Sequence, residues 1–296
     1  MDILRATTLV AAYSAFLNQS NADSRTPNSQ YGLTCDTVEL YNLVLPDGTI
    51  TTVDSSKSDL FFALKGGLNR FGIVTSIVYK SFPQVELIYG GILLYGSDAV
   101  PALIAATNTF QSQNTDPKAQ VILTLNGGLT SEAILILFYD GPNRPAAFDP
   151  YNDVASIPLL NTVATQSYSS FVAGVPSKVE SGNRGAFHTM MTKGLTTGFL
   201  NAVYNESVYW STFSLLNGAI LLSYDVEPFM NYGQYATDSA FPHSNSPLPL
   251  NLYYSWTAEI EDAFWRGAMQ QSIDHLIEVA KAEGVYTTDP AYPNCK

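Results

Sequence analysis

Few side chains in this chain are suited to exchanging a proton with a substrate. It contains three histidines and two cysteines, spread along 296 residues. General acid–base chemistry uses imidazole, phenol, carboxyl or thiol groups that are held against the reacting atoms. The weak candidates for such a role are His188 and Tyr254, in segments with strand character, and Tyr292 and Cys295 near the C-terminus. Core packing is the default interpretation for Tyr254, as it is for its neighbour Tyr253. The scattered histidines and cysteines predict no metal site.

The stretch from Asp59 to Thr75, DLFFALKGGLNRFGIVT, organises the first part of the chain. Ser58 and the residues up to Lys65 have a helical pattern, which Gly66-Gly67 would end because glycine tolerates a left-handed cap. A strand is expected from Ile73 to Phe82. A tight helix–strand connection explains these glycines, but Gly72 could also let a flat ligand lie against the main chain. A Walker-type phosphate loop is excluded, since no Gly-Lys-Ser/Thr follows.

The elements that must position these side chains follow from hydrophobic periodicity and turn residues. The strands are expected at 38–45, 49–53, 73–82, 87–95, 120–126, 132–139, 185–191, 211–224 and 250–257. The helices are expected at 59–65, 97–113, 196–207 and 259–283, with short helices at best in 141–183. Hairpins linking strand–helix–strand–strand units predict an α+β fold, with a mostly antiparallel sheet backed by helices. Asp36 is expected to position a loop, and His243 to be packed or solvated.

Composition and charge exclude several classes of partner. The chain is 46% hydrophobic and 14% charged, which predicts packed cores. A net charge of −12 argues against binding to nucleic acid or to an anionic membrane. No apolar run is long enough to span a bilayer. The N-terminus is a poor signal peptide, since Asp2 offsets Arg5. Secretion is left open by a mostly apolar stretch near the N-terminus and by the glycosylation sequons at Asn18 and Asn205.

Two motifs carry a resemblance to a known family. The strings ALKGG-x3-FGIVT and YGLTCDTVELYNLVLPDGTI (residues 31–50) resemble the FAD-binding domain of the vanillyl-alcohol-oxidase and p-cresol-methylhydroxylase (PCMH-type) superfamily, closest to the fungal berberine-bridge-enzyme-like oxidases. The resemblance implies an FAD-dependent oxidoreductase acting on a small-molecule substrate. It also implies cofactor contacts at Gly32, Leu33, Gly66, Gly67, Phe71, Gly72, Ile73 and Val74.

The C-terminal DPAYPNCK resembles the family's Tyr-x-Asn-Tyr segment, which returns to the flavin. By this resemblance Asn294 contacts the cofactor, and Tyr292 matches the first tyrosine. Cys295 replaces the second tyrosine, which is proposed as the base in some members.

The resemblance also predicts the organisation of the chain. Residues 1–30 stay unassigned, 31–84 correspond to the C-terminal part of the FAD-binding domain, 85–285 to the substrate domain and 286–296 to a shortened return segment. The two main parts are expected to form packed layers that meet at residues 66–74. Because residues 1–30 lack the family's glycine-rich pyrophosphate loop, the chain is expected not to retain FAD. The alternative function is an inactive remnant that serves as a binding or scaffold protein.

Overall fold

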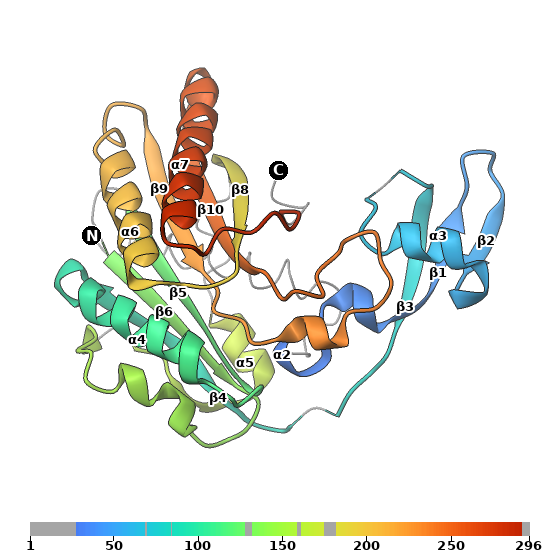
Figure 1. Cartoon of the computed structure of the whole chain (residues 1–296), viewed down its shortest axis with the longest axis horizontal. Helices are drawn as coiled ribbons and strands as arrows, with labels where there is room; N and C mark the ends of the chain where they lie inside the picture. The colour runs from blue at the N-terminus through green and yellow to red at the C-terminus, as the bar shows by residue number, and fades with distance from the viewer. Residues whose placement is uncertain are drawn as a thin grey trace.

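The computed structural model describes residues 28–68, 70–83, 85–127, 132–158, 161–174 and 182–291. These residues build two β-sheets of unequal size, joined by long connecting segments (Figure 1). The smaller sheet has three strands and the larger has seven, and all of the strand pairs are antiparallel. The predicted α+β class is confirmed.

The three-stranded sheet has the order β2-β1-β3: strand β1 is central, and it forms a hairpin with β2. Its elements are α2 (Asn28–Tyr31), η1 (Thr34–Thr37), β1 (Val38–Val44), β2 (Ile50–Val53), η2 (Ser55–Lys57), α3 (Ser58–Leu64) and β3 (Ile73–Tyr79). Tyr41, Leu43 and Val53 form a small core together with residues of α3. Strand β3 stays exposed: Ile73 is 70% accessible and Val78 41%. This unit therefore has a covered face and an uncovered edge.

The seven-stranded sheet has the order β7-β4-β6-β5-β9-β10-β8. Its strands are β4 (Ile88–Gly96), β5 (Ala119–Gly127), β6 (Glu132–Tyr139), β7 (Ala164–Gln166), β8 (Arg184–Thr192), β9 (Ala219–Val226) and β10 (Leu248–Trp256). The other elements of this part are η3 (Ser97–Ala99), α4 (Val100–Gln113), η4 (Ala146–Tyr151), α5 (Tyr168–Ala173), α6 (Thr197–Ser211), η6 (Tyr232–Tyr235), η7 (Glu259–Glu261) and α7 (Asp262–Ala282).

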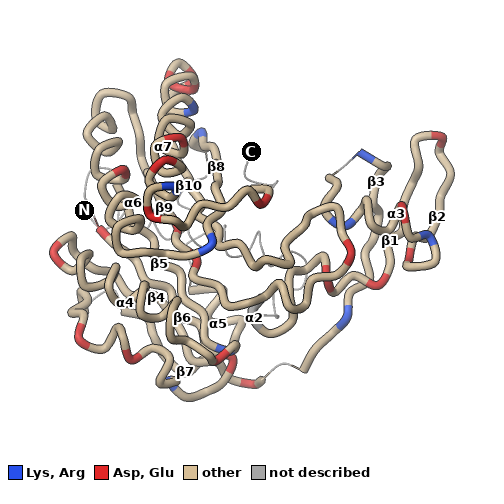
Figure 2. Tube along the Cα trace, viewed as in Figure 1, with Lys and Arg blue, Asp and Glu red and all other residues tan. Residues whose placement is uncertain are grey.

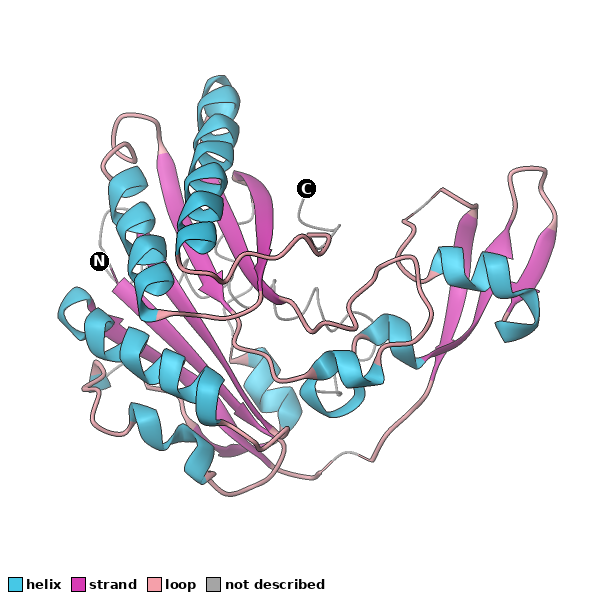
Figure 3. Ribbon diagram, viewed as in Figure 1, coloured by secondary structure: helices cyan, strands magenta, loops and turns pink. Residues whose placement is uncertain are grey.

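Helices α4, α6 and α7 lie side by side over one face of the large sheet (Figures 1 and 3). Every second residue of a strand points to this face, so the strands contribute alternate apolar side chains to the main core. Tyr254 and Trp256 of β10 pack there with Trp265 of α7, and all three are fully buried. The short helix α5 packs on the opposite face at the β4–β6 end.

One predicted boundary was wrong. Strand β9 begins at Ala219, whereas a strand was expected from residue 211. Helix α6 continues to Ser211 and is followed by a turn that ends at Gly218, whose φ is +62°. The run from 212 to 217 has strand composition, but a glycine in a left-handed conformation must come before the chain can enter the sheet.

The two units do not pack as layers that meet at 66–74. The three-stranded sheet stands away from the large sheet, and the long β9–β10 connection reaches out to it (Figure 1). Contact is made just before the predicted loop and at its first residue: the Ala240 N–H donates to the Phe62 carbonyl over 3.2 Å, and Gly66 packs on Phe241. A loop thus joins the units where two facing sheets were expected.

Surface charge in the described part of the chain is mixed. Lysines and arginines are scattered over the fold and do not gather on one face (Figure 2). In the same residues, none of the helices is both long enough and apolar enough to cross a membrane.

The close approach of α6 to the sheet gives a test of the fold. A Cβ added to Gly127 would lie 2.0 Å from the Ser207 carbonyl oxygen, whereas one added to Gly267 in α7 meets nothing within 4 Å. We expect Gly127→Ala to lower the free energy of unfolding by about 1–3 kcal/mol through overpacking. The matched change Gly267→Ala should raise it by about 0.5–1 kcal/mol through helix propensity. Urea unfolding midpoints measure both, and equal effects would contradict this packing.

Candidate functional site

A row of polar side chains lies on the face of the large sheet opposite α4, α6 and α7. Alternation along β5, β9, β10 and β8 directs these side chains away from the helices. We call this set the polar face: Gln120, Thr124, Asn126, Thr189, Ser223, Asp225, Glu227 and Asn251. All of them are buried. Polar side chains at such positions need hydrogen-bond partners, because an unpaired buried group is destabilising.

Two carboxylates organise this face. The Thr124 hydroxyl donates to Asp225 Oδ1 over 2.7 Å, and the Ser223 hydroxyl lies 3.1 Å from both Asp225 oxygens. On the next strand, Asn251 Nδ2 donates to Glu227 Oε1 over 2.9 Å. Both carboxylates and Asn251 are completely buried. The face therefore carries two buried carboxyl groups that are held in place by neighbouring donors.

Several amide atoms of the polar face have no hydrogen-bond partner among the described residues. These are Asn251 Oδ1, Gln120 Nε2 and both amide atoms of Asn126. Asn251 is 0% exposed, Asn126 2% and Gln120 4%. Buried polar groups are nearly always paired, so an unsatisfied group calls for a functional explanation. Such a set is suited to meeting the polar groups of a bound molecule.

An aromatic pair borders the polar face. Phe187 of β8 and Tyr253 of β10 are paired across the strands, and their ring centroids are 4.5 Å apart. Leu221 packs with them. The site thus combines polar donors and acceptors with a flat apolar surface, which is the usual composition of a small-molecule site.

Both predicted catalytic residues on strands face the other way. His188 is opposite Leu252 in the strand register, and it therefore points toward α7. Its Nδ1 accepts the Thr189 N–H at 2.9 Å, so the neutral ring carries its proton on Nε2 and donates it to Gln270 Oε1 over 3.0 Å. Because side chains alternate between the two faces along β8, His188 lies on the helix side of the sheet and not on the polar face.

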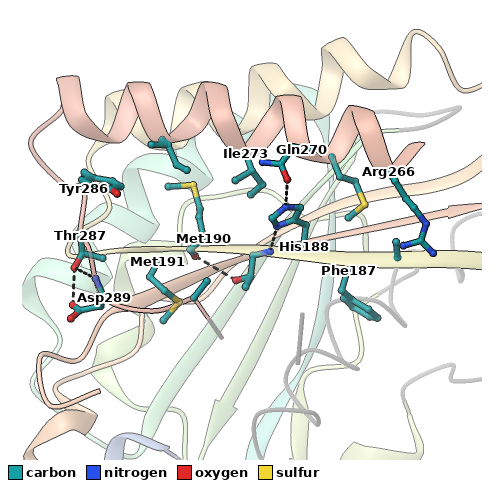
Figure 4. Close-up of a pocket in the computed structure, with 15 residues that line it drawn as sticks. Phe187, His188, Met190, Met191, Arg266, Gln270, Ile273, Tyr286, Thr287 and Asp289 are labelled. Carbon is teal, nitrogen blue, oxygen red and sulfur yellow. Dashed lines mark hydrogen bonds between the residues drawn. The ribbon is translucent and has the colours of Figure 1, made fainter. Parts of the chain in front are cut away.

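His188 instead lines a cavity of about 650 Å³ between β8, α7 and the segment that follows α7 (Figure 4). Met190, Met269 and Ile273 supply apolar walls, while Arg266 and Gln270 are polar. The cavity wraps around the edge strand: its lining includes Phe187 and Thr189 on the polar-face side of β8, but not Asp225, Glu227 or Asn251.

Tyr254 lies in the helix-side core. Its hydroxyl hydrogen-bonds to the Tyr224 hydroxyl, which in turn bonds to Ser272 Oγ at 2.8 Å. Burial raises the pKa of Tyr254 well above its ordinary value. Tyr254 therefore stays a neutral packing residue, and its neighbour Tyr253 is the tyrosine on the polar-face side.

The other predicted site residues divide into two groups. Tyr292, Asn294 and Cys295 lie outside the described residues. Three glycines expected to approach a cofactor are already close to protein atoms. A Cβ on Gly66, Gly67 or Gly72 would come within 2.6, 2.2 and 2.4 Å of Phe241, the Ala63 carbonyl and the Val44 carbonyl, respectively. Tight main-chain packing accounts for these glycines.

The turn at Gly32 and Leu33 is similarly enclosed. Gly32 has φ +87°, and a Cβ there would lie 2.8 Å from Tyr235. The Leu33 N–H donates to Asp36 Oδ2 over 2.9 Å. Of the predicted cofactor residues, Ile73 and Val74 on the open edge of β3 are the most exposed.

A buried ionic cluster joins the two units, and sequence reasoning missed most of it. Asp36 positions a loop as predicted: its Oδ1 accepts the Thr237 N–H and hydroxyl, at 2.8 and 2.9 Å. Its Oδ2 accepts from His243 Nε2 over 2.9 Å. Lys65 Nζ donates to the Thr237 hydroxyl over 2.6 Å. These residues are up to 207 positions apart, so no local pattern connects them.

The fold also brings Cys35 within 4.8 Å of Asp36 and His243, a grouping that could in principle hold a metal. Both ring nitrogens of His243 are already hydrogen-bonded, to Asp36 and to the Phe241 carbonyl. Burial, with a contribution from Asp36, raises the pKa of the Cys35 thiol to about 12, which disfavours the thiolate that a metal needs. We interpret the cluster as a hydrogen-bonded ion pair.

Comparison with known proteins places this geometry among flavoproteins. No family model matches the chain. An FAD-dependent monooxygenase of Arthrobotrys oligospora is 30% identical over 271 residues, which are 88% of this chain and 51% of that protein. An FAD-linked oxidoreductase of Arthroderma benhamiae is 35% identical over 159 residues, 53% of this chain and 31% of that protein. The chain thus spans about half or less of the length of these curated relatives.

Solved structures agree on the fold. BBE-like 1 of Physcomitrella patens, where BBE denotes berberine bridge enzyme, superimposes with a TM-score of 0.70 at 18% identity. The match covers 91% of this chain and 59% of that one. The chain therefore shares its fold with solved berberine bridge enzyme-like proteins, and it is similar in sequence to fungal FAD-linked oxidoreductases over part of their length.

Proposed function

We propose that this chain is the substrate-side portion of an FAD-dependent oxidoreductase that oxidises a small, hydroxylated metabolite. The observation that carries the proposal is the polar face, where buried amides without protein partners lie beside two buried carboxylates. We infer that the cofactor is FAD from the names of the sequence relatives and from the fold shared with the solved structures. We include in this proposal the domain boundaries predicted from the sequence, near residues 84 and 285.

The residues present fit a flavin in two places. The amide atoms of Asn251, Asn126 and Gln120 on the polar face offer donors and acceptors to a polar heterocycle. The open edge of β3 offers main-chain groups at Ile73 and Val74, as the motif resemblance implies. Gly66, Gly67 and Gly72 shape the connection that leads to this edge, and their packing keeps it tight. Bound FAD would supply the capacity to take up a hydride from the substrate.

The protein groups then have simple roles. Asn251 Oδ1 accepts a hydrogen bond from a substrate hydroxyl and orients it. Glu227, which is held by Asn251 Nδ2, receives the hydroxyl proton as the substrate is oxidised. Phe187 and Tyr253 provide an apolar surface for a flat substrate. Burial of the whole face excludes water from the reacting groups.

The alternative function, an inactive remnant that serves as a binding or scaffold protein, is not better supported, because the relatives are named as FAD-linked or FAD-dependent enzymes. Secretion also remains a proposal. Asn205 of the second sequon is exposed on α6, and detection of a glycan on Asn205 in secreted protein would support export.

The proposal predicts how the chain handles FAD. The purified 296-residue chain should be colourless, because few of its groups reach the cofactor. A fusion that places the N-terminal half of the Arthrobotrys relative before Tyr31 should be yellow and should hold FAD about a thousandfold more tightly, since about three charge-assisted hydrogen bonds are restored. Visible absorption and FAD titration measure both.

The N-terminal half expressed alone is the control for that experiment. If it holds FAD as tightly as the fusion does, the present chain contributes nothing to the cofactor site. In the fusion, Glu227→Gln should slow anaerobic bleaching of the flavin by a hydroxylated substrate about 10²–10⁴-fold, as loss of a general base does. Unchanged bleaching would exclude Glu227 from that role.

A polar face kept for function should also lower stability. We expect Asn126→Leu to raise the free energy of unfolding of the chain by about 1–2 kcal/mol, because it removes two unsatisfied buried atoms. Thr124→Val, two residues away on the same strand and face, should lower it by about 1–3 kcal/mol, because it takes a donor from Asp225. Urea unfolding measures both changes. A loss of stability in Asn126→Leu would show that this amide is satisfied.

A further inference from the structure

The hydrogen bonds around His243 determine its charge. Nδ1 lies 2.6 Å from the Phe241 carbonyl oxygen, which can only accept. Nε2 lies 2.9 Å from Asp36 Oδ2, which also accepts the Leu33 N–H. With Asp36 ionised, as the donors on both of its oxygens favour, each ring nitrogen faces an acceptor, and both bonds are made only if both nitrogens carry protons. The geometry therefore favours an imidazolium, whose side chain is 1% exposed.

Asp36 links the charged ring to the turn that precedes Asp36 in the chain, because it accepts hydrogen bonds from both. Its two oxygens accept four bonds: from Leu33 and His243 on Oδ2, and from the amide and hydroxyl of Thr237 on Oδ1. The Leu33 bond closes the turn in which Gly32 has φ +87°. His243 and Thr237 belong to the β9–β10 connection of the large sheet. The substrate-side unit thus reaches over and holds a turn of the other unit.

We propose that His243 is a positioning residue for the turn at Gly32 and Leu33, which the motif resemblance assigns to the cofactor, and that it couples the large sheet to this turn through Asp36. The inference rests on the proposed function, because Gly32 and Leu33 are cofactor residues only if the chain handles FAD. The physical linkage itself is independent of any ligand.

The charged and titratable groups around the ring are Asp36, Lys65 and Cys35, with Tyr232 stacked at 6.2 Å. Burial lowers the pKa of His243, but the hydrogen bonds to Asp36 and Phe241 outweigh burial and raise the pKa overall. Burial likewise raises the pKa of Asp36, but the bonds from His243 and Thr237 outweigh it and lower the pKa. The Cys35 thiol stays neutral, and Lys65 opposes protonation of the ring.

These directions define a pH window. The contribution of His243 is fully present below about pH 6.5, the unfolded value, and is lost as the pH rises through the raised folded pKa. The contribution of Asp36 is present above about pH 3.9 and is lost as the pH falls through its lowered folded pKa. The hydrogen-bonded pair of Asp36 and His243 should therefore contribute most to stability between about pH 4 and 6.5, and this contribution should fall at higher pH.

Nuclear magnetic resonance of the 296-residue chain tests the charge, since only three histidines contribute ring signals. With isotope-labelled histidine rings, one ring should stay doubly protonated above about pH 6.5, where a free imidazole loses its second proton. Its signal should vanish in His243→Gln and persist in His188→Gln and His275→Gln. Those two controls assign it by elimination if His243→Gln does not fold. A His243 ring that loses its second proton at or below about pH 6.5 would overturn the proposal.

Amide exchange tests the positioning. Exchange of the Leu33 N–H should be about tenfold faster in His243→Gln than in the unmodified chain. It should also quicken in the unmodified chain as the pH passes the folded pKa of His243, beyond the intrinsic pH effect seen in the variant. His275→Gln, whose side chain is 57% exposed on α7, is the matched control and should change neither. Unchanged Leu33 exchange in His243→Gln would refute the coupling.

FAD affinity of the fusion separates this inference from the proposed function. His243→Gln should weaken FAD binding about tenfold, whereas His275→Gln should leave it unchanged. Faster Leu33 exchange with unaltered FAD affinity would overturn the assignment of the turn to the cofactor. A fusion that binds no FAD would refute the proposed function, and the Leu33 exchange result would then decide the coupling alone.

Discussion

The alternation of side chains across a single antiparallel sheet governs this structure. Three helices cover one face of the seven strands and take up the apolar residues of every second position. The residues between them must point to the opposite face, and along β5, β9, β10 and β8 these residues are polar and buried. Buried polar groups satisfy one another or await a partner. The candidate site is the direct consequence of that constraint.

The same alternation separates neighbouring residues that look equivalent in the sequence. Tyr253 and Tyr254 are adjacent, yet one joins Phe187 at the border of the polar face and the other hydrogen-bonds to Tyr224 beneath α7. His188 follows Tyr254 into the helix side because it is opposite Leu252. Whether a catalytic candidate on a strand can reach the site therefore depends on strand register, since a shift of one residue exchanges the two faces.

The junction between the units depends on a different kind of interaction. A buried carboxylate costs several kcal/mol to desolvate unless charge and hydrogen bonds compensate. Asp36 receives both, from His243, Thr237 and the Leu33 amide. Because His243 and Thr237 come from the β9–β10 connection, closing this network brings that connection to the three-stranded unit (Figure 1). Charge satisfaction thus joins the two units, together with apolar contacts such as the packing of Leu33 in the main core.

Much of the fold could be predicted because local patterns encode it. The β1–β2 hairpin, helix α3 with its glycine cap and the long helix α7 were all expected close to their observed bounds. The motif around Gly66 and Phe71 led to the flavoprotein family, and the relatives agree with it. The sequence alone therefore determined most of the element types and the α+β class, and its short motifs indicated the likeness to FAD-linked enzymes, since these depend on periodicity, turn residues and short motifs. The tertiary structure decided which residues share a face, that Gly66 packs on Phe241, and that Asp36 pairs with a histidine 207 positions away. Those outcomes depend on strand register and on long-range charge pairing, which no local stretch of sequence carries.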